Sequence, residues 1–142
     1  MSKIAGKITA KFSNGVPAYQ LLGAEDGEVL VAGHGCGNLD FVAKILVRMG
    51  VKVILAKSFS TTFHNTVINY GIVPLVVDDE TYKELSVGDP LHLPYLDQEL
   101  TSSTTRTVTV EVKGKKYNLF HYLQPTERAI VLAGGLENYE KK

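Results

Sequence analysis

The feature that most constrains the fold is an alternation of short apolar runs and amphipathic stretches between residues 29 and 77. Three apolar runs are predicted strands: Val29–Ala32, Val51–Ala56 and Ile72–Val77. Each is separated from the next by a segment whose apolar residues recur at helical spacing. Strand, helix, strand, helix, strand over about fifty residues predicts parallel strands joined by crossover helices.

Both intervening segments have helix boundary signals. The first has a buried stripe at positions i, i+3, i+4 and i+7, made of Val42, Ile45, Leu46 and Met49. Asn38 is a suitable N-cap for it, and Gly50 can take the left-handed conformation that ends it. The second helix is expected to start at Ser58 or Ser60 and to end at Gly71.

The second half of the chain predicts antiparallel structure. Thr107–Val112 alternates apolar and polar residues, as a half-buried strand does, and the turn at residues 113–115 leads into a return strand at Tyr117–Phe120. We also expect a strand at Ile4–Phe12 and short helices at residues 78–85 and 125–132. The whole, residues 1–142, is predicted to be a single mixed α/β domain with an antiparallel appendage.

The composition excludes several classes of function. Lys plus Arg and Asp plus Glu both number 15 among 142 residues, so nothing favours nucleic acid or an anionic membrane as a partner. No apolar run approaches the roughly 20 residues that span a bilayer. The first seven residues lack a signal peptide's apolar segment, so we expect a cytoplasmic location. One cysteine, Cys36, cannot by itself form a disulfide, a four-thiolate zinc site or an iron–sulfur cluster.

The glycine-rich loop at residues 33–38 (Gly-His-Gly-Cys-Gly-Asn) is the strongest candidate for chemistry. Glycines let the backbone approach a ligand, and the N–H groups of a helix start favour a phosphate or carboxylate. The alternative is a tight turn that binds nothing. A dinucleotide-binding fingerprint fails because Asn38 stands where its third glycine would be, and no Gly-Lys-Ser/Thr sequence follows for a phosphate-binding loop.

These residues resemble a known family. Four short motifs are similar to the small subunit of 3-isopropylmalate dehydratase. They are Gly35-Cys36-Gly37 before a helix, residues 54–59 (Ile-Leu-Ala-Lys-Ser-Phe), residues 71–74 (Gly-Ile-Val-Pro) and the closing Ala-Gly-Gly-Leu at 133–136. That subunit corresponds to the swivel domain of aconitase. The resemblance implies an α/β fold of the swivelling β/β/α type, with a mixed sheet, crossover helices and an antiparallel hairpin.

The resemblance also implies a partner and a reaction. In this family, a large subunit carries a [4Fe–4S] cluster and the small subunit closes the cleft above it. Together they dehydrate and rehydrate a hydroxy acid, acting as a hydro-lyase. The cluster is therefore expected only in a large-subunit partner, with no cofactor or metal in this chain.

The sequence departs from the family at the glycine loop. The family continues Gly-Cys-Gly with Ser-Ser-Arg-Glu-His, where a serine is the catalytic base and the arginine binds a substrate carboxylate. Here Asn38 replaces the first serine and Asp40 replaces the arginine, so a cation becomes an anion. Two hypotheses stay open: a divergent small subunit, or a catalytically inactive paralogue that binds a small anion or has a regulatory role.

Ten residues are the candidates for substrate binding, with no catalytic group assigned: His34, Gly35, Cys36, Gly37, Asn38, Asp40, Ser58, Thr61, Thr62 and His64. For several of them a structural role competes with the functional one. His34 can be a loop histidine with a local hydrogen bond, Cys36 a small packing residue, and the second helix a solvated face.

Overall fold

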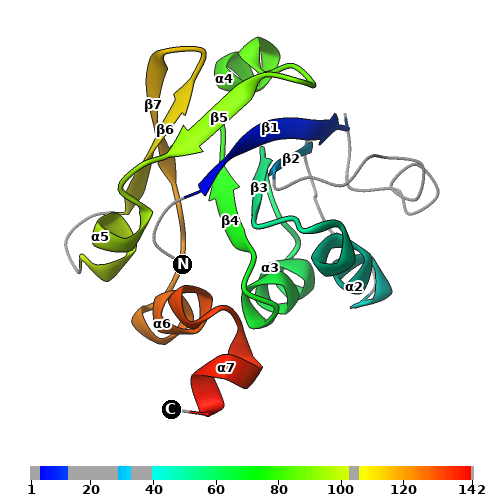
Figure 1. Cartoon of the computed structure of the whole chain (residues 1–142), viewed down its shortest axis with the longest axis vertical. Helices are drawn as coiled ribbons and strands as arrows, with labels where there is room; N and C mark the ends of the chain where they lie inside the picture. Colours follow the sequence, from blue (N-terminus) through cyan, green and yellow to red (C-terminus); the bar gives the residue numbers. More distant parts are fainter. Residues whose placement is uncertain (1–3, 13–28, 33–39, 103–105, 142) are drawn as a thin grey trace.

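The chain forms a seven-stranded barrel surrounded by short helices (Figure 1). The computed structural model describes residues 4–12, 29–32, 40–102 and 106–141. The strands are β1 (Ile4–Lys11), β2 (Val29–Ala32), β3 (Val53–Ala56), β4 (Val73–Val76), β5 (Pro90–Leu93), β6 (Thr107–Val112) and β7 (Lys115–Phe120). They close in the order β1-β2-β3-β4-β7-β6-β5.

Strands β1 to β4 form the parallel half of the barrel. The connections described between them are the helices α2 (Asp40–Met49) and α3 (Thr61–Asn69), which lie beside these strands in Figure 1. Ala32 of β2 pairs with Ala56 of β3, and Ala56 pairs with Val76 of β4. The carboxyl ends of these three strands therefore lie level at one edge of the barrel. The predicted strand–helix alternation is confirmed.

Strands β5 to β7 form the antiparallel half. The predicted hairpin is present as β6 and β7, and its turn at Lys113 and Gly114 has positive φ at both residues, as a type I′ turn requires. The expectation of an appendage is wrong, because both ends of this half join the parallel half. β5 pairs with β1, and β7 pairs with β4 at Val76 and Phe120, which closes the barrel.

Two apolar cores explain why the parallel strands are buried on both faces. The larger core fills the barrel and includes Val31, Leu55 and Leu75. The smaller core lies between the outer face of the strands and helices α2 and α3, and includes Ile54 and Phe63. Successive residues of β3 alternate between the two cores, as the pleat of a strand requires.

The remaining helices are short and each starts at an identifiable signal. They are α4 (Asp79–Glu84), α5 (Leu96–Thr101), α6 (Pro125–Ala133) and α7 (Leu136–Glu140). At the predicted start of α4, the Asp78 carboxylate accepts a hydrogen bond of 2.7 Å from the Thr81 N–H. Pro125 occupies the first turn of α6, as predicted. Helices α5 and α7 were not predicted.

Helix α3 is held against the α6–α7 junction by a close glycine contact. Gly71 has φ +81°, and a Cβ at this residue would lie 2.6 Å from the backbone carbonyl carbon and oxygen of Gly134. A Cβ on Gly135 would lie 2.8 Å from the Asn69 carbonyl oxygen. Two glycine elements separated by more than sixty residues in the sequence thus meet in space, and neither position has room for a side chain.

Candidate functional site

The carboxyl edge of the parallel strands is where ligands bind in sheets and barrels of this kind. The chain leaves β2 at Ala32 and β3 at Ala56, which are paired neighbours. The glycine loop therefore starts beside the segment Lys57–Ser58. Residues 33–39 themselves, including His34, Gly35, Cys36, Gly37 and Asn38, lie outside the described residues.

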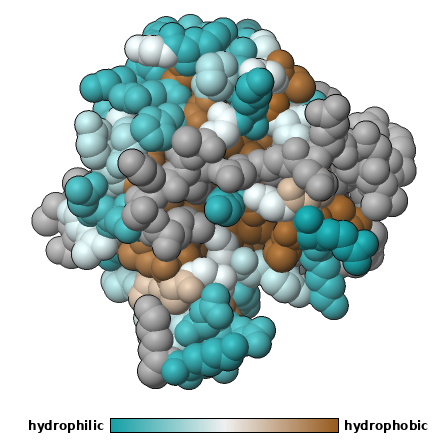
Figure 2. Space-filling model, in the orientation of Figure 1, coloured by the Kyte–Doolittle hydropathy of each residue, from teal (hydrophilic) through white to brown (hydrophobic). Residues whose placement is uncertain are grey.

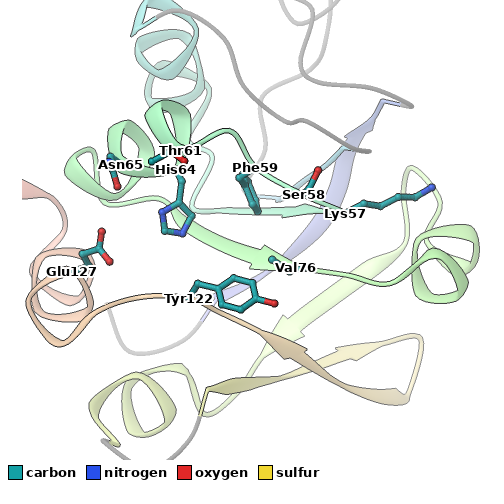
Figure 3. Close-up of a pocket in the computed structure, with 9 residues that line it drawn as sticks. All are labelled: Lys57, Ser58, Phe59, Thr61, His64, Asn65, Val76, Tyr122 and Glu127. Atoms are coloured by element: carbon teal, nitrogen blue, oxygen red, sulfur yellow. The ribbon is translucent and has the colours of Figure 1, made fainter.

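A pocket of about 510 Å³ opens at this edge (Figure 3). This volume lies in the range of small-molecule sites. One side is formed by the segment that connects β3 to α3 and by the first two turns of α3. The connecting segment supplies Lys57, Ser58 and Phe59, and the helix supplies Thr61, His64 and Asn65. The opposite side is supplied by Val76 at the end of β4, Tyr122 after β7, and Glu127 in the first turn of α6.

Helix α3 presents one face to the pocket because of how it is capped. The Ser60 side chain accepts a hydrogen bond of 3.2 Å from the Phe63 N–H, so Ser60 rather than Ser58 is the N-cap. Thr61, His64 and Asn65 follow at i, i+3 and i+4, and these positions share one face of a helix. Ser58 stays outside the helix and lines the pocket from the connecting segment.

His64 is half-buried, and its surroundings disfavour the charged form of its ring. Burial lowers the pKa of its imidazole, although the Glu127 carboxylate and a hydrogen bond with Asn65 act in the opposite direction. The ring packs edge-on against Phe59, with centroids 6.0 Å apart and an interplanar angle of 69°. A neutral imidazole offers one donor and one acceptor, so His64 can hydrogen-bond to a ligand without adding a charge.

Glu127 and Tyr122 complete the wall opposite α3. Glu127 belongs to the capping box of α6, where its Oε1 accepts a hydrogen bond of 2.8 Å from the Gln124 N–H. Tyr122 leaves 59% of its surface exposed, which is high for an aromatic residue. In Figure 3 both side chains lie on the side of the pocket facing His64.

Lys57 lines the pocket with its stem while its amine turns away toward α4 (Figure 3). The Lys57 Nζ lies 3.1 Å from the Asp79 carboxylate and 4.3 Å from the centre of the Tyr82 ring. Lys11, at the end of β1, places its own Nζ 4.4 Å from the same ring, and donates to the Tyr82 carbonyl at 2.8 Å. These lysines fix α4 to the barrel edge.

The structure brings together three of the predicted residues, Ser58, Thr61 and His64. Thr62 is exposed and does not line the pocket; its carbonyl accepts a hydrogen bond from the Thr66 hydroxyl at 2.8 Å. Asp40 is the first residue of α2, and its side chain lies outside what the structure describes. The role of all these residues in binding stays a prediction.

Sequence reasoning assigned no role to Lys57, Tyr122 or Glu127. Lys57 could have been found, because it directly follows a predicted parallel strand. Glu127 had a weaker signal as the third residue of a predicted helix that starts with Pro125. Tyr122 had none, because only closure of the barrel brings the end of β7 beside β4.

Among the residues that the structure describes, no three His, Cys, Asp or Glu side chains are grouped as a metal site requires. Within the same residues, no helix has the length and apolar character needed to cross a membrane. The described side chains therefore do not fit an iron–sulfur cluster or another metal bound by three such ligands.

Comparisons with known proteins agree with the resemblance seen in the sequence. Residues 9–80 match the family model described as the aconitase C-terminal domain. The chain is 34% identical over 121 residues to the methanogen homoaconitase small subunit of Methanocaldococcus jannaschii, covering 83% of this chain and 64% of that protein. It is 30% identical over 135 residues to the 3-isopropylmalate dehydratase small subunit of Rhizobium meliloti, covering 88% and 65% respectively. The chain thus spans less than two thirds of these relatives' length.

A crystal structure of 3-isopropylmalate dehydratase from Methanocaldococcus jannaschii has the same fold. It superposes with a TM-score of 0.71 at 23% identity, covering 98% of this chain and 93% of the other. The fold predicted from the glycine loop and its downstream elements is confirmed by this match.

Proposed function

Because this chain belongs to the family of aconitase C-terminal domains, we propose that it is the small subunit of a hydro-lyase, which dehydrates and rehydrates a hydroxy acid together with a large subunit. The single observation that best supports this function is the position of the pocket. It opens at the carboxyl edge of the parallel strands, next to the point where the glycine loop leaves β2. Both relatives described above are named as small subunits of such enzymes.

The acid is proposed to bind at the β2–β3 end of this edge. Backbone N–H groups at Gly35, Cys36 and Gly37 would hold a carboxylate, with the Ser58 hydroxyl on the neighbouring strand end as a further donor. His34 and Asn38 belong to the same loop, and Asp40 follows it at the start of α2. Glu127, at the far side of the pocket, would repel a dicarboxylate and so confine it to the loop end.

The large subunit is proposed to supply the [4Fe–4S] cluster and most of the reacting groups. One cysteine in 142 residues cannot ligate such a cluster, and the described residues hold no group of three metal-ligating side chains. The contribution of this chain is then to bind the acid through its loop and to cover the partner's site. We also propose that the chain is a single swivel-type domain and that it is located in the cytoplasm.

Co-expression with a large subunit of a 3-isopropylmalate dehydratase or a homoaconitase tests this function. We expect a stable complex by size-exclusion chromatography and, after cluster reconstitution, an absorbance rise from dehydration of 3-isopropylmalate or an absorbance fall from hydration of homoaconitate. Ser58→Ala should lower activity, while Ser86→Ala, an exposed position outside the pocket, should not. A complex that acts on none of these acids would contradict the catalytic role.

A second candidate is an anion-binding or regulatory domain without catalysis. It is favoured by Asn38 and Asp40, which stand where the family has a catalytic serine and a carboxylate-binding arginine. Calorimetry of the isolated chain with small dicarboxylates and phosphate separates the two candidates, since clear binding without a partner favours this one. Asn38→Ser with Asp40→Arg should tighten dicarboxylate binding if the cleft is otherwise that of the family.

A further inference from the structure

Among the described residues, the lining of the pocket at the carboxyl edge includes a carboxylate that no cation pairs with. Among the described residues, the one hydrogen bond to the Glu127 carboxylate is the capping bond from the Gln124 N–H, and no cation forms an ion pair with it. The Lys57 amine is paired with Asp79 instead, at 3.1 Å. Burial lowers the pKa of His64, which disfavours a compensating positive charge on its ring. The described lining therefore has a net charge of about −1 when Lys57 and Asp79 are counted together.

The same pocket also has aromatic side chains on both of its walls. Phe59 and Tyr122 belong to opposite walls, and Tyr122 is 59% exposed. Aromatic faces attract cations, and the attraction increases when the cation is removed from water. Asn65, Ser58 and Thr61 add oxygen atoms that can accept hydrogen bonds. A pocket that combines a carboxylate, aromatic rings and neutral acceptors is complementary to a planar cation.

We propose that this pocket binds a guanidinium group, the side chain of an arginine presented by a partner protein. A guanidinium has five N–H donors in one plane, can form two parallel hydrogen bonds to Glu127, and stacks on aromatic rings. An ammonium group is a compact point charge that gains less from flat walls. An anion at the Glu127 end of the pocket, away from the loop end proposed for the acid, would be repelled by this carboxylate, and no cation in the described lining would offset the repulsion.

The exposed aromatic residues around the pocket indicate a protein as the source of the arginine. Phe120 is 53% exposed and Tyr122 is 59% exposed, two residues apart at the end of β7. Exposed aromatics next to a pocket are typical of protein interfaces, where tyrosine and arginine are enriched. Figure 2 shows hydrophobic side chains gathered in the middle of one face of the molecule, between hydrophilic ends. The identification of the partner rests on the proposed function: if that function holds, the large subunit presents the arginine.

A peptide titration of the isolated full chain tests the site without any partner. The probes are the capped tripeptide acetyl-Gly-Arg-Gly-amide, its lysine and citrulline counterparts, and methylguanidinium, followed by NMR shifts of His64, Phe59 and Tyr122. We expect the arginine peptide to bind more tightly than the lysine peptide and about tenfold more tightly than neutral citrulline. Citrulline binding equal to arginine, or methylguanidinium binding without peptide binding, would overturn the proposal.

Glu127→Gln and Glu140→Gln form a matched pair for this titration. Glutamine at 127 keeps an oxygen for the capping bond, so the fold of α6 is retained, whereas Glu140 is exposed on α7 outside the pocket. Glu127→Gln should weaken the arginine peptide about tenfold and Glu140→Gln should leave it unchanged. Equal affinities of the two variants would contradict the role of Glu127.

The assignment of the partner is tested in the co-expressed complex. Glu127→Gln and Tyr122→Ala should both weaken association with the large subunit, measured by the concentration dependence of complex formation. If both variants associate with the large subunit as the unchanged chain does, the large subunit is not the source of the arginine, even if the peptide binds. The proposed function and the arginine site can fail separately. If only the function is wrong, the complex forms and the peptide still binds, but no hydroxy acid is converted.

Discussion

Replacing Gly71 with alanine tests whether the contact between α3 and the α6–α7 junction determines the shape of the pocket. Helix α3 carries His64, and α6 carries Glu127, on opposite walls. The two helices meet where Gly71 packs against Gly134, and a Cβ at Gly71 would lie 2.6 Å from two backbone atoms. Backbone cannot rotate away as a long side chain can, so the helices must separate.

The cost can be estimated with Gly50 as a matched control. Gly50 has φ +89°, close to the +81° of Gly71, but a Cβ there would meet no atom within 4 Å. An alanine at Gly50 therefore costs only the left-handed conformation, about 1 kcal/mol, and the loss of unfolded-state entropy is common to both variants. Gly71→Ala adds the overlap, for which overpacking costs about 1–3 kcal/mol more.

Urea unfolding followed by far-UV circular dichroism measures both variants. We expect Gly71→Ala to lower the free energy of unfolding by about 2–4 kcal/mol and Gly50→Ala by about 1 kcal/mol. The denaturant dependence should stay similar, so the difference appears as a shift of the midpoint. Equal destabilisation of the two variants would refute the close-packing argument, because backbone conformation alone would then explain both.

Three further substitutions test contacts away from the glycines. Burial lowers the pKa of His121 to about 4, so between pH 6.5 and 4 the unfolded chain binds a proton that the folded chain does not. The free energy of unfolding should therefore fall by about 1.4 kcal/mol for each unit by which the pH decreases in this range. His121→Asn should remove this part of the pH dependence, measured by urea unfolding at a series of pH values. Tyr82→Phe loses the 2.8 Å hydrogen bond from the Tyr82 hydroxyl to the Phe12 carbonyl and should cost about 1 kcal/mol in thermal unfolding, while no loss would show that water replaces the bond. Glu99→Ala removes the carboxylate that accepts from both the N–H and the hydroxyl of Thr109, and should cost about 1.5–3 kcal/mol; a smaller loss would show that α5 is held by its apolar residues instead.

Local patterns predicted the parallel half of the fold because its elements are encoded in short stretches. The run Val53–Ala56 is buried on both faces, which requires a continuous apolar sequence. Gly50 has the predicted positive φ after α2, and Asp78 caps α4 as expected. In each case the signal lies within a few residues of the structure that it predicts.

The closed barrel could not be predicted in this way. β5 is four residues long, starts with Pro90, and is defined by its pairing with β1, more than eighty residues away in the sequence. Helix α5 has no side-chain cap at Tyr95, so its start has no sequence signature. Such elements are stabilised by tertiary contacts rather than by local propensity.

The residues of the candidate site also fall into two groups, those with a local sequence signal and those placed only by tertiary contacts. Ser58, Thr61 and His64 lie within eight residues after a predicted strand, so its position at the carboxyl edge was enough to predict them. Tyr122 and Glu127 come from the other end of the chain, and only the pairing of β7 with β4 places them opposite α3. The charge of the pocket depends on Glu127 and on the orientation of Lys57 toward Asp79, which no sequence pattern contains.

Hydrogen–deuterium exchange of this chain, alone and with the co-expressed large subunit proposed as its partner, tests most directly whether the pocket edge faces that partner. The account predicts slower amide exchange in two segments on complex formation, residues 57–65 and 120–127. The hairpin turn at 113–114, at the other end of β7 from Phe120, should change little. Protection confined to other segments, or a large subunit that forms no complex with this chain, would contradict it.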